Sequence, residues 1–106
     1  MMAAMKELII PNAAFRDENA VEMMRVWIAE RGLHCTLNIG RYFGSPDASE
    51  EKGWGIILAD AARHVSEAIA KRNGSAAAES LSQIREHFLG ELARPTSPVK
   101  GDFGGN

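Results

Sequence analysis

Two side chains four positions apart, Asp60 and His64, are the first candidates for chemistry in this sequence. On a helix they share one face, where a carboxylate can orient an imidazole as in the second half of a catalytic triad. The nucleophile would have to come from elsewhere, for example from Cys35. Cys35 alternates in phase with Leu33 and Leu37, which predicts an inert position in the core. We therefore predict no catalytic residue and favour an ion pair at the edge of a helix.

The polar side of the segment 33–39 is a second candidate. Its alternation of apolar and polar residues predicts a half-buried strand with His34, Thr36 and Asn38 on one face. Such a face either meets water or lines a pocket, and the alternation leaves both readings open. The predicted ligand-binding residues are His34, Thr36, Asn38, Asp60 and His64.

Known metal and nucleotide motifs are missing from the sequence. The three histidines, His34, His64 and His87, fall on different predicted elements, and no pair has the spacing of a zinc motif. The acidic stretch 47–51 lacks the residue order of a calcium loop. There is no Walker loop, no dinucleotide glycine motif and no basic patch. We predict no metal, no cofactor and no nucleic-acid partner, in line with a net charge of −2.

Length and composition predict one small cytoplasmic domain. The chain has 106 residues, 45% of them hydrophobic and 25% charged, which is ordinary for one globular domain. A single cysteine excludes an intrachain disulfide and fits a reducing compartment. No stretch approaches the roughly 20 apolar residues of a membrane span, and the first residues lack the charge order of a signal peptide. We expect a disordered leader at 1–5, a single domain at 6–93 and a flexible tail at 94–106.

The first part of the chain is predicted to form a strand and a helix. A short strand at 6–11 ends at Pro11, which has no N–H to donate to a ladder. A helix follows over 18–31, because Asp17 is a good N-cap and Gly32 a good C-cap. Its apolar side is wider than the usual stripe, which predicts a second covered surface. The predicted interface residues are Met23, Trp27 and, from a later helix, Ile56.

Two more helices are expected in the second half. One runs over 50–72 after Ser49 or Asp47 as N-cap, and the next runs from a cap at Ser75 to about Ala93. The fold class is therefore α+β, with a short sheet of about two strands per chain packed by three helices. Because two strands alone are marginal in water, we expect a homodimer to complete the sheet or to cover the wide helix face.

Three stretches carry a resemblance to a known family. LHCTLNIG at 33–40, followed by a short acidic loop and WGIILADAARH at 54–64, resembles a small alphaproteobacterial family of unknown function. ELIIPNAAFRDENAVEMMRVW at 7–27 resembles the opening of that family, so the likeness spans about 6–72. The family has no assigned activity and implies no catalytic role. It makes Trp54, Gly55, Asp60, Arg63 and His64 the first residues to test.

Three functions are consistent with these patterns. The leading hypothesis is a non-catalytic, homodimeric binding or adaptor domain in the cytoplasm, with a protein or a small metabolite as partner and neither nucleic acid nor a membrane. The second is a small enzyme or ligand sensor that uses His34, Asp60 and His64. The third is a structural subunit of a larger complex. The first rests on the missing catalytic set and on apolar surface beyond the need of one core.

Overall fold

The computed structural model describes residues 6–42, 46–47 and 49–103. The predicted leader at 1–5 lies outside these residues. The elements in chain order are α1 (Asn12–Arg16), β1 (Met24–Ala29), β2 (Gly32–Leu37), α2 (Glu50–Asn73), α3 (Ala77–Ala93) and β3 (Val99–Asp102).

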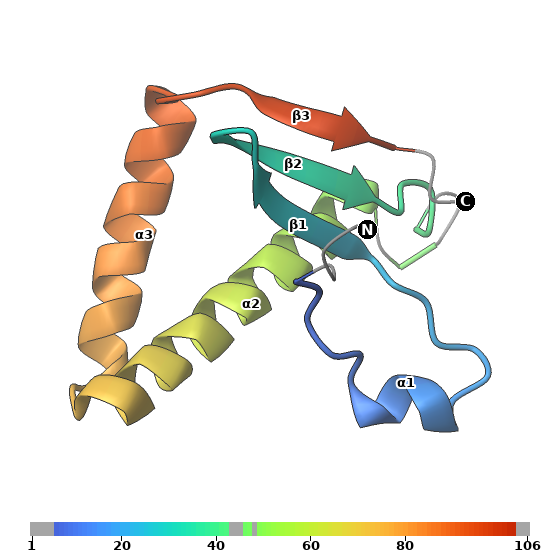
Figure 1. The fold of residues 1–106 in the computed structure, drawn as a ribbon, viewed down its shortest axis with the longest axis horizontal. Coiled ribbons are helices and arrows are strands. Elements are labelled where there is room, and N and C mark those ends of the chain that lie inside the picture. The colour runs from blue at the N-terminus through green and yellow to red at the C-terminus, as the bar shows by residue number, and fades with distance from the viewer. Residues whose placement is uncertain (1–5, 43–45, 48, 104–106) are drawn as a thin grey trace, which may run out of the picture.

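The described strands form one mixed sheet in the order β1-β2-β3 (Figure 1). β1 and β2 are antiparallel neighbours, and β2 and β3 are parallel neighbours. Parallel strands need a long crossover, and here α2 and α3 form it. This architecture confirms the predicted α+β class. The sheet has three strands in the described part of the chain, where the sequence predicts about two.

The helix predicted over 18–31 is wrong, because most of this segment belongs to a β-hairpin. β1 pairs along its whole length with β2, from Met24↔Leu37 to Ala29↔Gly32. Its residues include Val26, Trp27 and Ile28, which are types that favour strands. The partner strand β2 lies outside the segment 18–31 from which the helix was predicted. The hydrogen bonds between β1 and β2 outweigh the local preference for a helix.

The residues that predicted the ends of that helix have other roles. The Asp17 carboxylate accepts a hydrogen bond from the Asn19 amide at 2.9 Å, which makes a local turn after the short helix α1. At the other end, Glu30 and Arg31 have φ angles of 50° and 62° and join β1 to β2 as a two-residue turn. Both central residues with positive φ are typical of the type I′ hairpin turn, which usually carries Asn or Gly.

The strand predicted at 6–11 is also wrong. Residues 6–11 have no assigned strand pairing, and Leu8 and Ile9 are 88% and 93% exposed. Pro11 precedes α1 and serves as its N-cap position without a side-chain hydrogen bond. The segment is held to the hairpin by a polar contact from Glu7 to Arg25.

The segment 94–106, predicted as a flexible tail, contains the third strand. β3 lies beside β2 with Val99 opposite Leu33 and Gly101 opposite Cys35. Gly101 has φ of 148°, and a Cβ atom there would stand 1.7 Å from the Cys35 carbonyl oxygen. This close backbone approach requires glycine. The residues of β3 show no apolar alternation that would predict a strand. The strand forms by pairing with β2, which precedes both long helices in the chain.

The two long helices match the sequence prediction. The Ser49 hydroxyl caps α2 by accepting from the Lys52 amide at 3.1 Å. Gly74 ends α2 in the left-handed conformation, and its amide donates to the Ala70 carbonyl at 2.8 Å. The predicted cap at Ser75 is wrong by one residue, since Ala76 precedes α3 and supplies no side-chain hydrogen bond.

The chain is open rather than tightly packed. The radius of gyration is 16.1 Å, whereas a compact chain of this length has about 13 Å. Close backbone packing, with Cα atoms within 8 Å, joins β1 to β2, β2 to β3 and α2 to α3, but joins no described strand to α2 or α3. No described hydrophobic side chain is fully buried, and Ser66, 2% exposed, is the one buried polar residue among those described.

Candidate binding surface

The polar face of the sheet is built from paired positions on all three strands. The register places His34 opposite Trp27 on β1 and opposite Lys100 on β3. Thr36 lies opposite Arg25 and Asp102 in the same way. Paired residues of a ladder point to the same side, so these side chains share one face. His34 and Trp27 are half-buried and Thr36 is exposed.

Asn38 serves the hairpin itself. Its backbone amide donates to the Met23 carbonyl at 2.9 Å, and its side-chain amide donates to the Glu22 carbonyl at 3.4 Å. Both bonds extend the pairing of the two strands beyond Leu37. Of the three residues predicted on the polar face, Asn38 is thus the one with a defined structural role.

The Asp60 carboxylate pairs with Arg63 instead of His64. The Arg63 guanidinium donates to Asp60 at 2.9 Å across three positions of α2, and both side chains are more than half exposed. Such an exposed pair adds little to stability. His64 is exposed and makes no hydrogen bond with another described residue. The geometry that would orient an imidazole is therefore not formed here.

Other predicted ligand residues stand on separate elements. No Cα atom of β2, which carries His34 and Thr36, lies within 8 Å of a Cα atom of α2, which carries Asp60 and His64. Cys35 is half-buried on the opposite face of the sheet from His34, in phase with Leu33 and Leu37 as predicted. The residues predicted as a site thus place no nucleophile beside a base.

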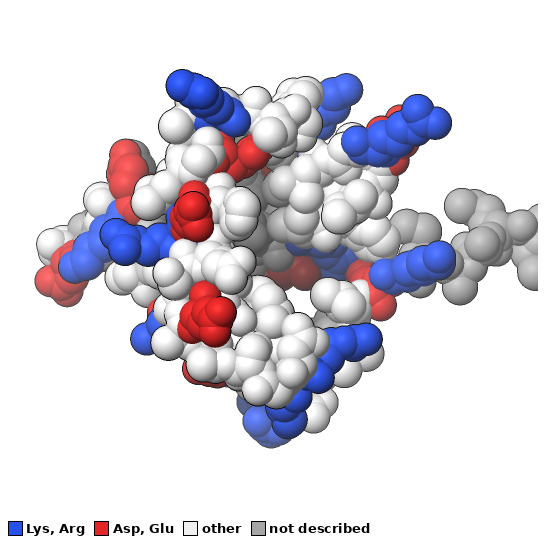
Figure 2. Space-filling view, turned by 90° about the vertical axis from the view of Figure 1, so that its left-hand side faces the viewer, with Lys and Arg blue, Asp and Glu red and all other residues white. Residues whose placement is uncertain are grey.

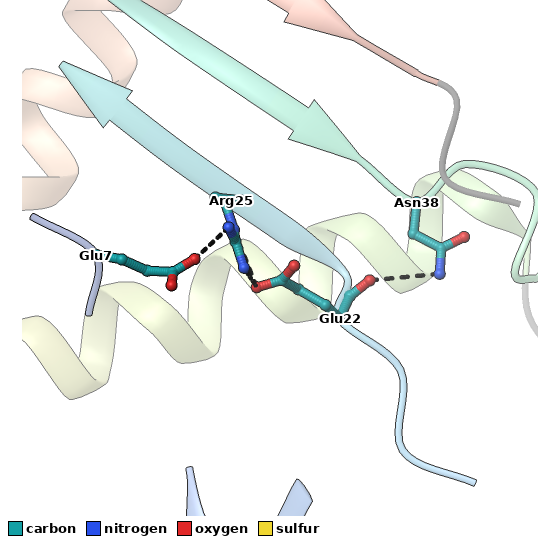
Figure 3. A network of polar contacts seen from close by, with 4 residues as sticks. All are labelled: Glu7, Glu22, Arg25 and Asn38. Carbon is teal, nitrogen blue, oxygen red and sulfur yellow. Dashed lines mark hydrogen bonds and ion pairs between the residues drawn. The ribbon is translucent and has the colours of Figure 1, made fainter. Parts of the chain in front are cut away.

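A polar network fastens the start of the chain to β1 (Figure 3). Arg25 donates to the Glu22 carboxylate at 3.1 Å and contacts Glu7 as well. The hydrogen bond that Arg25 donates to Glu22, the charge of that carboxylate and the charge of Glu7 together raise the pKa of the Arg25 guanidinium. The network is exposed, and its role is to position the segment 6–11 against the hairpin edge.

A second cluster, at the start of α2, was missed by the sequence analysis. The Glu50 carboxylate accepts hydrogen bonds from the Tyr42 backbone amide and, at 3.2 Å, from the Trp54 indole N–H. The Tyr42 ring packs on Gly53, where a Cβ atom would stand 2.5 Å from ring carbons. Glu50 four positions before Trp54 was a readable helical pair, but nothing in the sequence placed Tyr42 beside it.

The three predicted interface residues are not enclosed by their own chain. Met23 and Trp27 are half-buried, and Ile56 is 51% exposed. Met23 directly precedes β1 and Trp27 lies in β1, instead of on the helix predicted over 18–31. Ile56 lies on α2, a helix that the sequence predicted. The interface role of these residues stays a prediction, and the secondary structure predicted for Met23 and Trp27 was wrong.

An apolar groove runs between α2 and α3. On the α2 side it is lined by three small residues together with Leu58 and Arg63, and on the α3 side by large residues. Phe88 remains 46% exposed there, and Leu89 and Leu92 on the same helix are 52% and 67% exposed. Figure 2 looks onto the α3 side of the molecule, where uncharged side chains occupy much of the view and Lys and Arg project mainly at its rim. The apolar lining residues are Gly55, Leu58, Ala59, Ala62, Leu81, Ile84 and Phe88.

Two further properties concern the described residues alone. They contain no group of three or more His, Cys, Asp or Glu side chains placed to hold a metal ion. None of their helices combines the length and the apolar character that crossing a bilayer demands.

The chain is similar to one protein family and to a solved structure. The family model Domain of unknown function (DUF5076) matches residues 7–96, which includes both long helices and the hairpin. A solved structure described as a "putative pyruvate dehydrogenase from the photosynthetic bacterium Rhodopseudomonas palustrus CGA009" is 31% identical. The match covers 92% of this chain and 93% of that one, with a TM-score of 0.64. A search of curated proteins gives no match.

Proposed function

The chain belongs to DUF5076, a family of unknown function, and from this premise we propose that it is a non-catalytic binding or adaptor domain that acts as a homodimer. We place it in the bacterial cytoplasm, since its single cysteine offers no intrachain disulfide and its structural neighbour is bacterial. Its partner would be a protein or a small metabolite.

The uncovered apolar area carries this proposal. The chain exposes 9388 Å², whereas a compact monomer of 11.5 kDa exposes about 5,800 Å². The excess of roughly 3,600 Å² is several times the area of about 800 Å² that each partner buries in a standard interface. Ile28 at 83% and Leu92 at 67% exposure belong to this surface. The surface of 9388 Å² is polar and apolar together, and the large apolar side chains exposed within it favour a permanent cover.

The polar residues support a binding role over catalysis. Asp60 is paired with Arg63, and the described nucleophile Cys35 has no base as a hydrogen-bond partner. The words "putative pyruvate dehydrogenase" describe the structural neighbour and not this chain. We do not extend a dehydrogenase activity to this chain, because the described structure does not bring His34 together with Asp60 and His64, the residues predicted to carry chemistry.

Sedimentation velocity on the purified chain tests the proposal. We expect a stable dimer of about twice 11.5 kDa at micromolar concentration. A well-folded monomer under these conditions would contradict it. The competing hypothesis of a ligand sensor is tested on the same sample by NMR titration with a metabolite library. A common ligand that shifts both His34 and His64 would replace the adaptor proposal.

The hypothesis of a structural subunit predicts a different result. A tagged chain should then recover one other protein in a fixed molar ratio, and the chain alone should not form a stable dimer. Recovery of the chain as a homodimer without such a stoichiometric partner supports the proposed function.

A further inference from the structure

We propose that the groove between α2 and α3 is the homodimer interface, and that it receives the exposed apolar ridge of α3 from a second copy of this chain. The ridge consists of Phe88, Leu89 and Leu92. This inference rests on the proposed homodimer and adds which surface forms it. In a two-fold dimer the same patch serves both copies, so each groove takes the ridge of the other.

The shape of the groove fits a helix. Its α2 wall presents the small residues Gly55, Ala59 and Ala62, beside which another helix can approach closely. Leu58 on the same wall adds apolar area for that helix to contact. A Cβ atom at Gly55 would meet nothing within 4 Å inside its own chain, so the space in front of this wall is open. The facing wall carries Leu81 and Ile84, which are half-buried.

The matching convex surface lies on α3 of the same chain. Leu89 and Leu92 project from the helix with 52% and 67% of their surfaces exposed. Phe88 belongs both to the groove lining and to the ridge, which makes groove and ridge one continuous apolar patch. A patch that holds both a hollow and a ridge is self-complementary, as an isologous interface must be.

The charge arrangement permits the groove to be covered. Arg63 and Arg85 stand at the groove. Arg63 is already paired with Asp60 at 2.9 Å, so covering the neighbouring apolar floor leaves no isolated charge on that side. The aliphatic stems of both arginines can lie along a helix while their charged ends stay in water.

The required area favours a second copy over an occasional partner. No described hydrophobic side chain is fully buried in the single chain, so a partner that binds only at times would leave the fold without a core between encounters. A second copy is present whenever the chain itself is present. The whole chain exposes roughly 3,600 Å² more total surface than a compact monomer, which is more than the area of about 800 Å² that each partner buries in a standard interface.

The test introduces a charge on the groove floor. Ala59 is exposed in the single chain, so Ala59→Glu buries no charge within its own protomer but places a carboxylate inside the proposed interface. Ala68→Glu is the matched control, since Ala68 is exposed on the same helix and does not line the groove. In sedimentation equilibrium the dimer dissociation constant of Ala59→Glu should rise by about 30-fold or more. That of Ala68→Glu should stay near the wild-type value.

The outcomes separate this inference from the proposed function. A wild-type monomer overturns both. A wild-type dimer that Ala59→Glu leaves intact overturns the groove as interface while the homodimer stands.

If circular dichroism shows that Ala59→Glu is unfolded, a mixed dimer of labelled and unlabelled wild-type chains decides. Isotope-filtered NMR should then detect contacts from the Ala59 methyl group of one copy to the Phe88 ring or the Leu89 methyls of the other. Absence of these contacts in a confirmed dimer overturns the proposal.

Discussion

The helix pair α2–α3 and the hairpin β1–β2 belong to one small chain but depend on contacts of different range. α2 begins where Ser49 accepts from the Lys52 amide and ends where the Gly74 amide donates to the Ala70 carbonyl. Both contacts lie within four residues. β1 depends on a ladder with β2, and β2 pairs in turn with β3, which the chain reaches only after both helices.

The difference teaches how ambiguous a capping residue is. Ser49 and Asp17 are both good N-cap types, yet only Ser49 begins a long helix. Asp17 closes a turn on Asn19, and the apolar residues after it enter a strand. A cap stabilises a helix only if the following residues gain more from helical packing than from another partner. For β1 that other partner is β2.

The largest expected effect is on the long-range side of this comparison. Gly101→Ala should destabilise the protein by about 3 kcal/mol, because its Cβ atom would overlap the Cys35 carbonyl oxygen and the φ angle is unfavourable for alanine. Urea unfolding measures the loss, and hydrogen exchange should show faster exchange in β2 than in α2. The control is Gly90→Ala in α3, where a Cβ atom meets nothing within 4 Å. Its helix propensity predicts a gain of about 0.5–1 kcal/mol. Equal changes in unfolding free energy for Gly101→Ala and Gly90→Ala would contradict the view that the sheet depends on this close backbone contact.

The hairpin turn offers a smaller effect of opposite sign. Glu30 and Arg31 hold positive φ angles that Asn and Gly adopt more easily. The double variant Glu30→Asn, Arg31→Gly should stabilise the protein by about 1 kcal/mol, which thermal unfolding can measure. The same pair of residues placed at Arg72 and Asn73, in the last turn of α2, should destabilise, because glycine weakens a helix. If the turn variant lowers the stability, the positive φ angles at positions 30 and 31 do not reduce the stability of the hairpin.

The smallest effect is expected at the polar network. Arg25→Gln removes the bonds to Glu22 and Glu7, but the network is exposed and screened by water, so the thermal midpoint should change little. Because the carboxylates raise the pKa of a group that is already a strong base, its contribution is fully present below the guanidinium pKa of the unfolded chain and is lost only as the pH rises through the pKa of the folded state. The effect should therefore be constant between about pH 6 and pH 9 and should shrink in high salt. A strong dependence on pH in this range would contradict the assignment.

The candidate surface was only partly predictable. Alternation in 33–39 correctly placed Leu33, Cys35 and Leu37 on one face and His34 on the other. Helical spacing put Asp60 and His64 on one face of α2, but the Asp60 carboxylate forms its ion pair with Arg63. The contact between Tyr42 and Gly53 joins a loop to a helix, so spacing along the chain could not reveal it.

The sequence by itself determined α2 and α3, the strand β2 with its two faces, and the α+β class. These features depend on caps, periodicity and composition, which act over a few residues or over the chain as a sum. Only the tertiary structure decided that β1 is a strand, that the residues around Gly101 add a third strand, and that the groove between the helices stays open. Backbone ladders and helix packing join residues far apart in the chain, and their free energy outweighs the local preferences that point elsewhere.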